Sequence, residues 1–300
     1  MRRIVFVLVP QLHVLDLAGP AQVFFTAGDV GFEHALTYVS DRADVPTAQG
    51  IPLRAETEWP ELTVEDLVMV PGWRTPRLTR TGWVPDATLS RLRAHHAAGG
   101  TVASVCSGAD LLGRAGLLDG RRCTTHHELQ DELGARYPRA HVVRDVLYVS
   151  DGRIITSAGI VSGIDLALHL IATWHGPHVA ARVARSMVVY ARRNGTDRQE
   201  SVMLRYRNHL NDAVHRVQDL IDTRLADPLP LPDLARAAGC SERTLTRQFS
   251  TATGLTPLGY QQLLRRERAD HLIEHGATVE SAARTVGFAD ARMLRRLRAR

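Results

Sequence analysis

Short apolar runs alternate with amphipathic stretches over the first half of the chain. Five runs have the length and density of strands, several of them buried on both faces, at residues 4–9, 36–39, 67–70, 101–105 and 154–156. The stretches 86–98 and 164–174 between them have a helical pattern. Strands that alternate with helices predict an α/β domain with a doubly wound, mostly parallel sheet. Such sheets bind ligands at the carboxyl ends of their strands.

The last third of the chain has a helical pattern. Pro232 suits the first position of a helix, and Gly239 suits the left-handed conformation that ends it. Ser241 suits the cap of a second helix, on which Leu245 and Phe249 lie four residues apart and face inward. Two helices joined by a tight glycine turn are therefore predicted, which is a helix-turn-helix.

The same pattern occurs twice. The segment 235–239 returns 48 positions later at 283–287, and Leu245-Thr246-Arg247 returns 49 positions later at 294–296. A continuous helix predicted over 257–275 joins the copies. One copy is compatible with any helical bundle, but two copies in the same order favour an all-α DNA-binding domain with two helix-turn-helix units.

The second helix of each copy carries the residues that we expect to contact DNA. They are Arg243, Thr246, Arg247 and Ser250 in the first copy and Arg292, Arg295 and Arg296 in the second. Arginine can donate two hydrogen bonds to a guanine edge or bind a phosphate, and threonine can contact a base. An arginine-bearing helix face is also commonly just solvated, so the charge of the whole segment matters.

Positive charge is concentrated in the repeated segment. Residues 228–300 contain 12 arginines and 7 acidic residues, whereas residues 1–196 contain 20 arginines and 19 acidic residues. The net charge of +5 therefore lies in the repeat. This distribution indicates a local DNA-binding surface rather than nonspecific binding by the whole protein. The chain has no lysine, so every positively charged side chain is an arginine. Arginine suits two-pronged hydrogen bonds to bases and phosphates, but the codon bias of a genome would also explain the absence of lysine.

Residues 210–300 resemble the AraC/XylS family of transcription regulators. The resemblance rests on the segment 241–249, Ser-Glu-Arg-Thr-Leu-Thr-Arg-Gln-Phe, and on Thr253-Gly254-Leu255-Thr256-Pro257. It implies that Arg243, Thr246 and Arg247 of the first copy and Arg292, Arg295 and Arg296 of the second face the bases. Members of that family continue into a closing helix, whereas Arg298 stands at their aromatic position and the sequence stops at Arg300. We therefore expect weaker DNA contact from the second copy.

Composition limits the class of protein to which the chain can belong. A hydrophobic content of 44% is ample for the cores of about two domains. The apolar run at 4–9 is too short for a membrane span and lacks a secretory cleavage site. Cys106, Cys123 and Cys240 form no disulfide framework, so we expect a cytoplasmic protein. We expect no metal or other cofactor, because no histidine or cysteine spacing matches a known site.

The segment 102–109, Val-Ala-Ser-Val-Cys-Ser-Gly-Ala, carries the candidate chemistry of the first half. A buried strand that runs into a small-residue turn and a helix is typical of a nucleophile elbow, with Cys106 at its top. At a helix start we expect the dipole to lower the pKa of this thiol. A lone cysteine after a strand is also commonly a packing residue, so both interpretations remain open.

Residues 1–190 resemble the PfpI-type, class I glutamine amidotransferase-like superfamily. The resemblance implies that a carboxylate, Asp16, and a histidine, His126, accompany Cys106. Asp16 could instead cap its helix. Joined to an AraC-type domain, this front domain gives the layout of GlxA-like transcription regulators, although His127 replaces the tryptophan usual there. We predict a sensor and dimerisation domain at 1–190, a linker at 191–209 and the DNA-binding domain at 210–300.

Three functional hypotheses follow. In the first, the chain is a homodimeric, sequence-specific transcription regulator, not an enzyme, that binds promoter DNA and a small-molecule effector or redox signal, with RNA polymerase as a further partner. In the second, Cys106 is the nucleophile of a hydratase or hydrolase that carries a DNA-binding appendage. In the third, the front domain only dimerises the protein. The sequence does not identify the effector or the operator.

Overall fold

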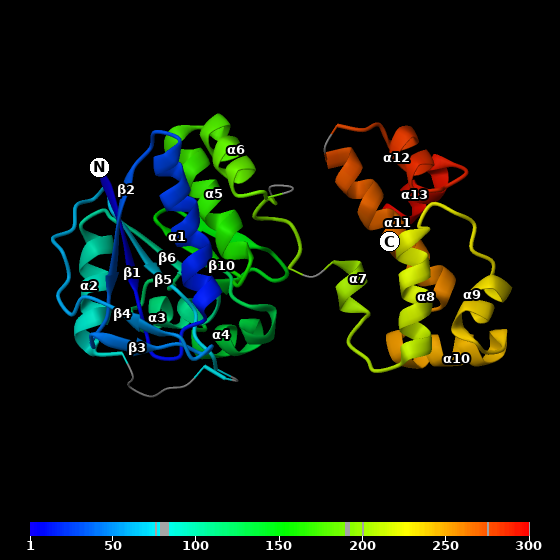
Figure 1. Ribbon diagram of the computed structural model, residues 1–300, viewed down its shortest axis with the longest axis horizontal. Coiled ribbons are helices and arrows are strands. Elements are labelled where there is room, and N and C mark those ends of the chain that lie inside the picture. Colours follow the sequence, from blue (N-terminus) through cyan, green and yellow to red (C-terminus); the bar gives the residue numbers. More distant parts are fainter. Residues whose placement is uncertain (76, 79–83, 190–192, 200, 275, 300) are drawn as a thin grey trace. The chain divides into compact units, whose positions relative to one another are not determined.

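The chain folds into two compact units, Met1–Gln199 and Glu200–Arg300 (Figure 1). The computed structural model describes residues 1–75, 77–78, 84–189, 193–199, 201–274 and 276–299. The stretch 191–209, expected as a linker, includes positions 191, 192 and 200, which lie outside the described residues. None of the helices in the described ranges is long and apolar enough to cross a membrane.

A six-stranded sheet forms the centre of the front unit. Its strand order is β2 (His34–Val39), β1 (Arg2–Val7), β5 (Leu67–Val70), β6 (Thr101–Val105), β10 (Ile154–Ser157) and β9 (Tyr148–Asp151). All neighbouring strands are parallel except β10 and β9. The apolar runs explain this arrangement, because every residue of β5 and β10 is buried. The predicted doubly wound, mostly parallel sheet is confirmed.

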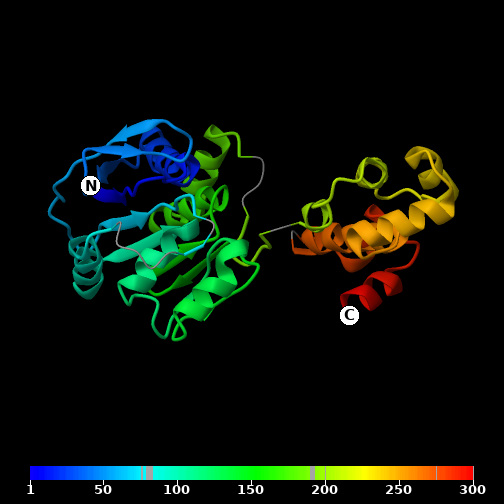
Figure 2. The same cartoon turned by 90° about the horizontal axis from the view of Figure 1, so that it is seen from below.

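Helices cover both faces of this sheet (Figure 2). One face carries α1 (Val14–Asp29), α5 (Ser162–His175) and α6 (Pro177–Ser186), and the other carries α2 (Asp86–Ala97), α3 (Ala109–Arg114) and α4 (Gln130–Arg136). Two short 3-10 helices, Cys106–Gly108 and His127–Leu129, lie in the loops. Two small sheets complete the unit, formed by β3 (Asp44–Pro46) with β4 (Pro52–Arg54) and by β7 (Arg122–Cys123) with β8 (His141–Val142).

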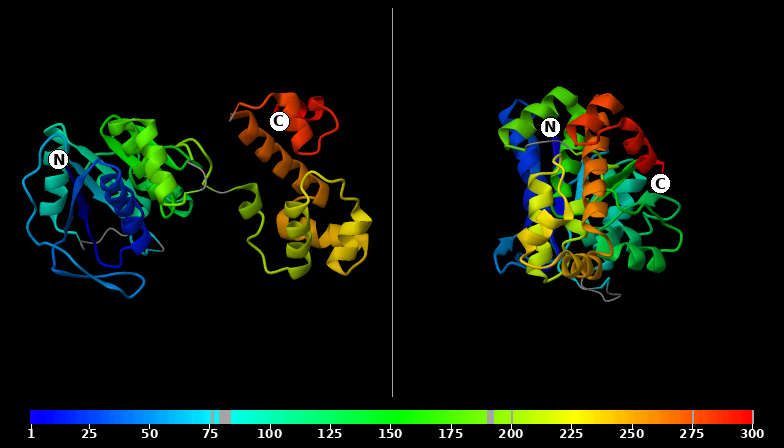
Figure 3. Two further views of the ribbon diagram at one scale, coloured as in Figure 1. Left: turned by 45° about the horizontal axis from the view of Figure 1, so that its top comes forward. Right: turned by 90° about the vertical axis from the view of Figure 1, so that its right-hand side faces the viewer.

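The rear unit is entirely helical. It comprises α7 (Val202–Arg205), α8 (Asp212–Thr223), α9 (Leu231–Ala238), α10 (Glu242–Thr253), α11 (Pro257–Glu274), α12 (Val279–Thr285) and α13 (Ala291–Arg298). Figure 3 shows α11 running between the α9–α10 pair and the α12–α13 pair. The predicted all-α fold with two helix-turn-helix units is confirmed.

Local sequence explains where the helices of the first copy begin and end. Gly239 has a left-handed φ of 72°, which ends α9, and the Ser241 hydroxyl accepts a hydrogen bond from the Thr244 N–H at the start of α10. Leu245 and Phe249 are fully buried, as their spacing predicts. They pack with Tyr260 of α11 and residues of α8 in one apolar cluster.

The second copy has the same plan and a smaller core. Thr278 and Asp290 cap α12 and α13 with their side chains. Alanines make up half of the buried cluster here, which consists of Ala269, Ala282, Ala283, Val286, Phe288 and Leu294. Gly287 has a φ of 84° and approaches the loop between α8 and α9 so closely that a Cβ atom would lie 2.0 Å from the Ala226 carbonyl oxygen.

Arg265 of α11 fastens the two copies together. Its guanidinium donates hydrogen bonds of 2.8 Å to the carbonyl oxygens of Leu225, Asp227 and Gly287. Leu225 and Asp227 belong to the loop that precedes α9, whereas Gly287 follows α12. One guanidinium therefore links the loop before α9 to the turn after α12.

Candidate functional site

Cys106 lies directly after β6, at the carboxyl end of a central strand. Its φ is +56°, an uncommon value for a residue with a side chain. The thiol-bearing residue is only 6% exposed. Two glycines lie against it: a Cβ atom on Gly72 would be 2.6 Å from the Cys106 Cβ, and one on Gly159 would be 2.3 Å from it. The elbow therefore depends on close backbone approach from two neighbouring loops.

Side-chain hydroxyls hold the elbow in place. The Ser107 hydroxyl accepts a hydrogen bond from the Trp73 N–H at 2.7 Å and donates one to the Trp73 carbonyl at 3.0 Å. The Thr125 hydroxyl donates to the Cys106 carbonyl at 2.8 Å. Ser107 thus holds the loop after β5 next to the elbow. Thr125 binds the loop after β7 to the backbone of Cys106. Sequence reasoning missed the roles of Ser107, Thr125 and Gly159, although Ser107 lies in the elbow segment 102–109 and Thr125 directly precedes the candidate His126.

Asp16 lies beside the elbow, in the first turn of α1. The residue is fully buried. A Cβ atom on Gly72, which would be 2.6 Å from the Cys106 Cβ, would also be 2.5 Å from one Asp16 carboxyl oxygen. Within the described ranges, neither carboxyl oxygen accepts a hydrogen bond of ordinary geometry, so Asp16 does not cap its helix. Burial raises its pKa to about 7, while the Cys106 thiol and the Gly72 N–H act in the opposite direction.

The Cys106 thiol does not have the lowered pKa expected from its position at a helix start. Burial, followed by the nearby Asp16 carboxyl, raises the pKa of Cys106, and the Ser107 backbone N–H only partly offsets them. Desolvation outweighs the dipole because the thiol is almost completely enclosed. The expected lowering of the Cys106 pKa is therefore wrong, because burial favours the neutral thiol over the thiolate.

His126 directly follows Thr125, whose hydroxyl binds the Cys106 carbonyl. Its Nδ1 lies 3.7 Å from a Glu128 carboxylate oxygen, and its ring lies 4.2 Å, centroid to centroid, from that of His127. The structure thus brings Asp16 and Cys106 into direct proximity and places His126 one residue beyond the threonine that binds the Cys106 carbonyl. In the part of the chain that the structure describes, no three histidine, cysteine or acidic side chains converge as metal ligands would.

The exposed side of α10 forms the wall of an open groove in the rear unit. The groove has a volume of about 620 Å³ and is lined by Leu231, Glu242, Arg243, Thr246, Arg247, Ser250 and Thr251. All four residues predicted to contact DNA from the first copy therefore lie together. Among the described residues, Arg243 and Arg247 are exposed and form no ion pair or hydrogen bond. Thr246 and Ser250 donate to the carbonyls of Glu242 and Leu255.

The arginines of α13, in contrast, have partners. Arg292 forms an ion pair with Asp290 at 3.3 Å, and Arg295 pairs with Glu280 of α12. Arg296 contacts the sulfur of Met293 at 3.1 Å. Arg298, at the position where an aromatic residue was expected, pairs with Asp270 of α11 at 2.8 Å.

The two parts of the chain match different protein families. Residues 2–173 match the DJ-1/PfpI family, and residues 234–300 match a helix-turn-helix domain. The HTH-type transcriptional regulator CdhR of Pseudomonas aeruginosa is 30% identical over 273 residues, which cover 89% of this chain and 79% of that protein.

Two further similarities each cover more than half of the chain. An isonitrile hydratase of Pseudomonas putida is 37% identical over 172 residues, or 55% of this chain and 68% of that protein. The crystal structure of an AraC family transcriptional regulator from Pseudomonas putida superimposes with a TM-score of 0.53 at 25% identity, covering 62% of this chain and all of that one. The chain therefore belongs to the DJ-1/PfpI family and, through its AraC-type helix-turn-helix domain, to the GlxA-like transcription regulators.

Proposed function

We propose that this regulator reads promoter DNA mainly with α10 and receives its signal at the Asp16–Cys106 pair. The observation that carries the DNA-reading part is the groove in which Arg243 and Arg247 are exposed without a partner among the described residues. Free guanidinium groups on one helix face need no rearrangement before they donate to guanine edges or phosphates. Thr246 and Ser250 add two hydroxyl oxygens to the same face.

The second copy contributes Arg292, Arg295 and Arg296 to the same DNA. Arg292 and Arg295 must first leave their acidic partners. We therefore propose that it adds phosphate contacts and little base reading. Basic charge concentrated in the rear unit supports this division between a local DNA footprint and a nearly neutral front unit.

The front site suits a small polar effector or an oxidant. Asp16, when protonated, can donate a hydrogen bond that a carboxylate cannot, and its pKa of about 7 keeps both forms accessible near neutral pH. The Cys106 sulfur is the adjacent reactive atom, and His126 is available to exchange protons. An effector that favours one protonation state would stabilise one arrangement of the pocket over another.

We further propose that the regulator works as a cytoplasmic homodimer that contacts RNA polymerase at its promoters. The support for a dimer is physical: one rear unit offers a small contact area, and paired sites raise both affinity and specificity.

Genome-wide binding of the tagged protein in its own host tests the DNA-reading proposal. We expect discrete promoter peaks that disappear with Arg247→Ala. Arg236→Ala is the matched control, because Arg236 is an exposed arginine of α9 that pairs with Asp233 and lies outside the groove. Peaks that persist in Arg247→Ala would place the reading surface elsewhere. A change in the peaks with Cys106→Ser would show that the front site controls binding.

A cysteine-dependent hydratase or hydrolase is the second candidate function. Two observations favour it: the buried carboxyl beside the elbow thiol, and the similarity of the front unit to an isonitrile hydratase. In this case the Cys106 sulfur would attack an electrophilic carbon, and Asp16 or His126 would take the thiol proton and return one to the adduct. Turnover of an isonitrile that Cys106→Ser abolishes would support the enzyme. A regulator should show no turnover, and its Cys106→Ser variant should still bind DNA but lose the response of that binding to the signal.

A further inference from the structure

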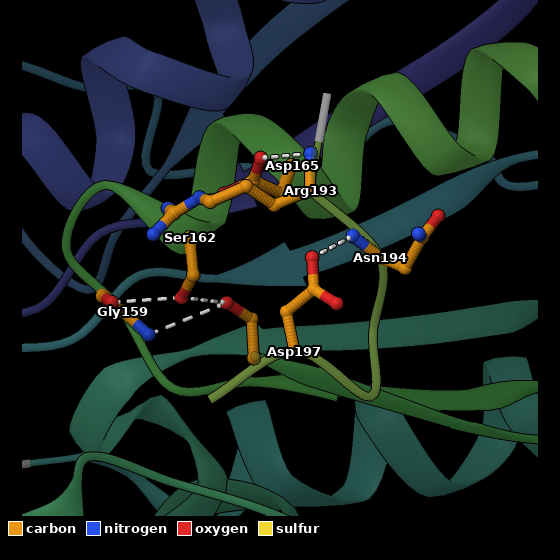
Figure 4. Close-up of polar contacts among 7 residues, drawn as sticks. Gly159, Ser162, Asp165, Arg193, Asn194 and Asp197 are labelled. Carbon is orange, nitrogen blue, oxygen red and sulfur yellow. Dashed lines mark hydrogen bonds and ion pairs between the residues drawn. The ribbon is translucent and has the colours of Figure 1, made fainter. Parts of the chain in front are cut away.

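The segment 193–199, called the strap below, is the last part of the front unit before the DNA-binding unit begins (Figure 4). Its first residue, Arg193, pairs with Asp165 in the first turn of α5. The Arg193 Nε lies 3.1 Å from an Asp165 carboxylate oxygen, and the Arg193 backbone N–H donates to the other oxygen at 3.4 Å. Asp165 is only 5% exposed, whereas the Arg193 side chain is 38% exposed, so the strap begins at an ion pair whose release would leave a buried carboxylate without its cation.

The middle of the strap lies against the start of the edge strand β9. The Leu147 N–H donates to the carbonyls of Gly195 and Asp197, at 2.9 and 3.0 Å. A Cβ atom on Gly195 would lie 2.8 Å from the Tyr148 carbonyl oxygen, so the contact requires glycine. The Asp197 carboxylate accepts a hydrogen bond from the Asn194 N–H at 2.7 Å, which closes a tight turn (Figure 4).

The end of the strap is bound to the loop that holds Cys106. The Gln199 side-chain amide donates to the carbonyls of Thr125 and Val146, each at 3.0 Å. The Gln199 backbone N–H donates to the Asp145 carboxylate at 3.2 Å. Since the Thr125 hydroxyl donates to the Cys106 carbonyl, a single residue separates the end of the strap from the elbow.

The start of the strap is connected to the elbow as well. Asp165, which holds Arg193, lies three residues after Ser162 on α5. The Ser162 hydroxyl donates to the Gly159 carbonyl at 2.7 Å and shares a hydrogen bond with the Ser157 hydroxyl (Figure 4). Gly159 is the residue packed against the Cβ of Cys106. Both ends of the strap therefore lead to the backbone around Cys106.

We propose that the strap is the coupling element of the regulator: a chemical change at Cys106 shifts Thr125 and Gly159, loosens the strap, and so alters the chain that enters the DNA-binding unit. The strap has two states, bound and released, and both the pocket and the DNA-binding unit bias the balance between them. The effect on DNA rests on the proposed function. The coupling between pocket and strap does not, and it is tested without DNA.

Alkylation of Cys106 by iodoacetamide measures the coupling from the strap to the pocket. The sulfur forms a bond to carbon, iodide leaves, and the thiol proton passes to the buffer. Because Cys106 is enclosed, its reaction requires local opening. In the full chain we expect Gln199→Ala to raise the alkylation rate of Cys106 at least about 5-fold, the lower end of coupling between sites.

Two controls separate coupling from general destabilisation. Gln22→Ala removes a glutamine of α1 whose side chain donates a hydrogen bond to the Thr26 hydroxyl, away from the strap, and it should leave the rate unchanged. Cys123 is fully buried in the same unit and serves as an internal reference in the same sample. A rise confined to Cys106 supports the proposal. Equal acceleration of Cys106 and Cys123, or no acceleration of either, overturns it.

Hydrogen exchange measures the coupling in the other direction. Alkylation of Cys106 should speed amide exchange across residues 193–199. Exchange of α2, which lies on the face of the sheet opposite to α5, should stay unchanged. Arg193→Gln should speed exchange in the same segment, and Arg139→Gln, which removes an exposed pair with Asp119, should not. If Arg193→Gln does not fold because Asp165 is left unpaired, Gln199→Ala decides. Unaltered exchange of the strap after complete alkylation would refute the coupling even if the protein binds DNA.

Discussion

The two helix-turn-helix copies share a sequence pattern but differ in how they are stabilised. The first is built around large, fully buried side chains, including Phe249 and Tyr260, and exposes arginines with no partner among the described residues. The second has a small core and ties Arg292 and Arg295 to acidic residues. The comparison teaches that a duplicated motif can keep its helices while its surface charges are used inside the protein.

The difference has a direct consequence for DNA binding. Exposed ion pairs contribute about 0–1 kcal/mol each, so they hold the second copy only weakly. They must nevertheless be broken before the same guanidinium groups can reach phosphates or bases. The first copy has no such cost, and we expect it to supply most of the affinity.

The largest expected effect is on the stability of the first core. Phe249→Ala should lower the free energy of unfolding of the rear unit by about 3–5 kcal/mol, whereas Leu294→Ala should cost less, near the lower end of about 2–5 kcal/mol, because it removes less buried volume. Native-state amide exchange of α10 and α13 measures both changes. Equal losses in the two copies would contradict the difference between their cores.

Alanine substitution of the turn glycines should destabilise the second copy more than the first. Gly239→Ala meets no atom within 4 Å and suffers only from its positive φ, a cost of about 1–2 kcal/mol. Gly287→Ala would in addition collide with the Ala226 carbonyl, for a total of about 2–4 kcal/mol. Thermal unfolding of the two variants gives the order directly. A larger loss from Gly239→Ala would mean that the contact with Ala226 is easily displaced.

Arginine substitutions should separate the copies in DNA binding. Arg247→Ala should weaken binding to a selected promoter fragment by about 1–3 kcal/mol, or roughly 5- to 150-fold. Arg295→Ala should change it less than about 3-fold, because part of the lost contact is offset by not having to break the pair with Glu280. Titrations by fluorescence anisotropy at fixed salt compare them. Similar losses would show that both copies read DNA equally.

The smallest effect should be a gain. Glu280→Gln releases Arg295 and should tighten DNA binding by up to about 5-fold at low salt, with the gain fading as salt screens the pair. Glu274→Gln is the control, because it removes an exposed acidic residue of α11 that has no ion pair among the described residues. If both variants tighten binding equally, net charge rather than the release of Arg295 is responsible.

Periodicity and turn chemistry predicted most of the fold. Buried runs of apolar residues are a strong signal, and those at 36–39, 67–70 and 101–105 correspond to β2, β5 and β6. The β3–β4 and β7–β8 pairs and the edge strand β9 were not predicted, because strands of two to four residues, several of them partly exposed, carry too little pattern.

The candidate site could be predicted only in part. The elbow and the positions of Asp16 and His126 came from local sequence and resemblance, and their roles remain proposals. The raised pKa of Cys106 could not be inferred, because it depends on enclosure by Gly72 and Gly159 from other strands. The ion pairs of α13 were missed for a similar reason: Arg295 and Glu280 lie 15 residues apart and meet only after α12 and α13 pack together.

The length of α11 has a consequence for the shape of the DNA. A helix of 18 residues is about 27 Å long, whereas successive major grooves on one side of straight B-DNA recur about every 34 Å. Both α10 and α13 contact this helix, so we expect a duplex that engages both of them to curve toward the protein. Bending of this kind costs on the order of 1–6 kcal/mol and depends on how easily the intervening base steps deform. Base pairs that no side chain touches would then help to decide which promoters are bound.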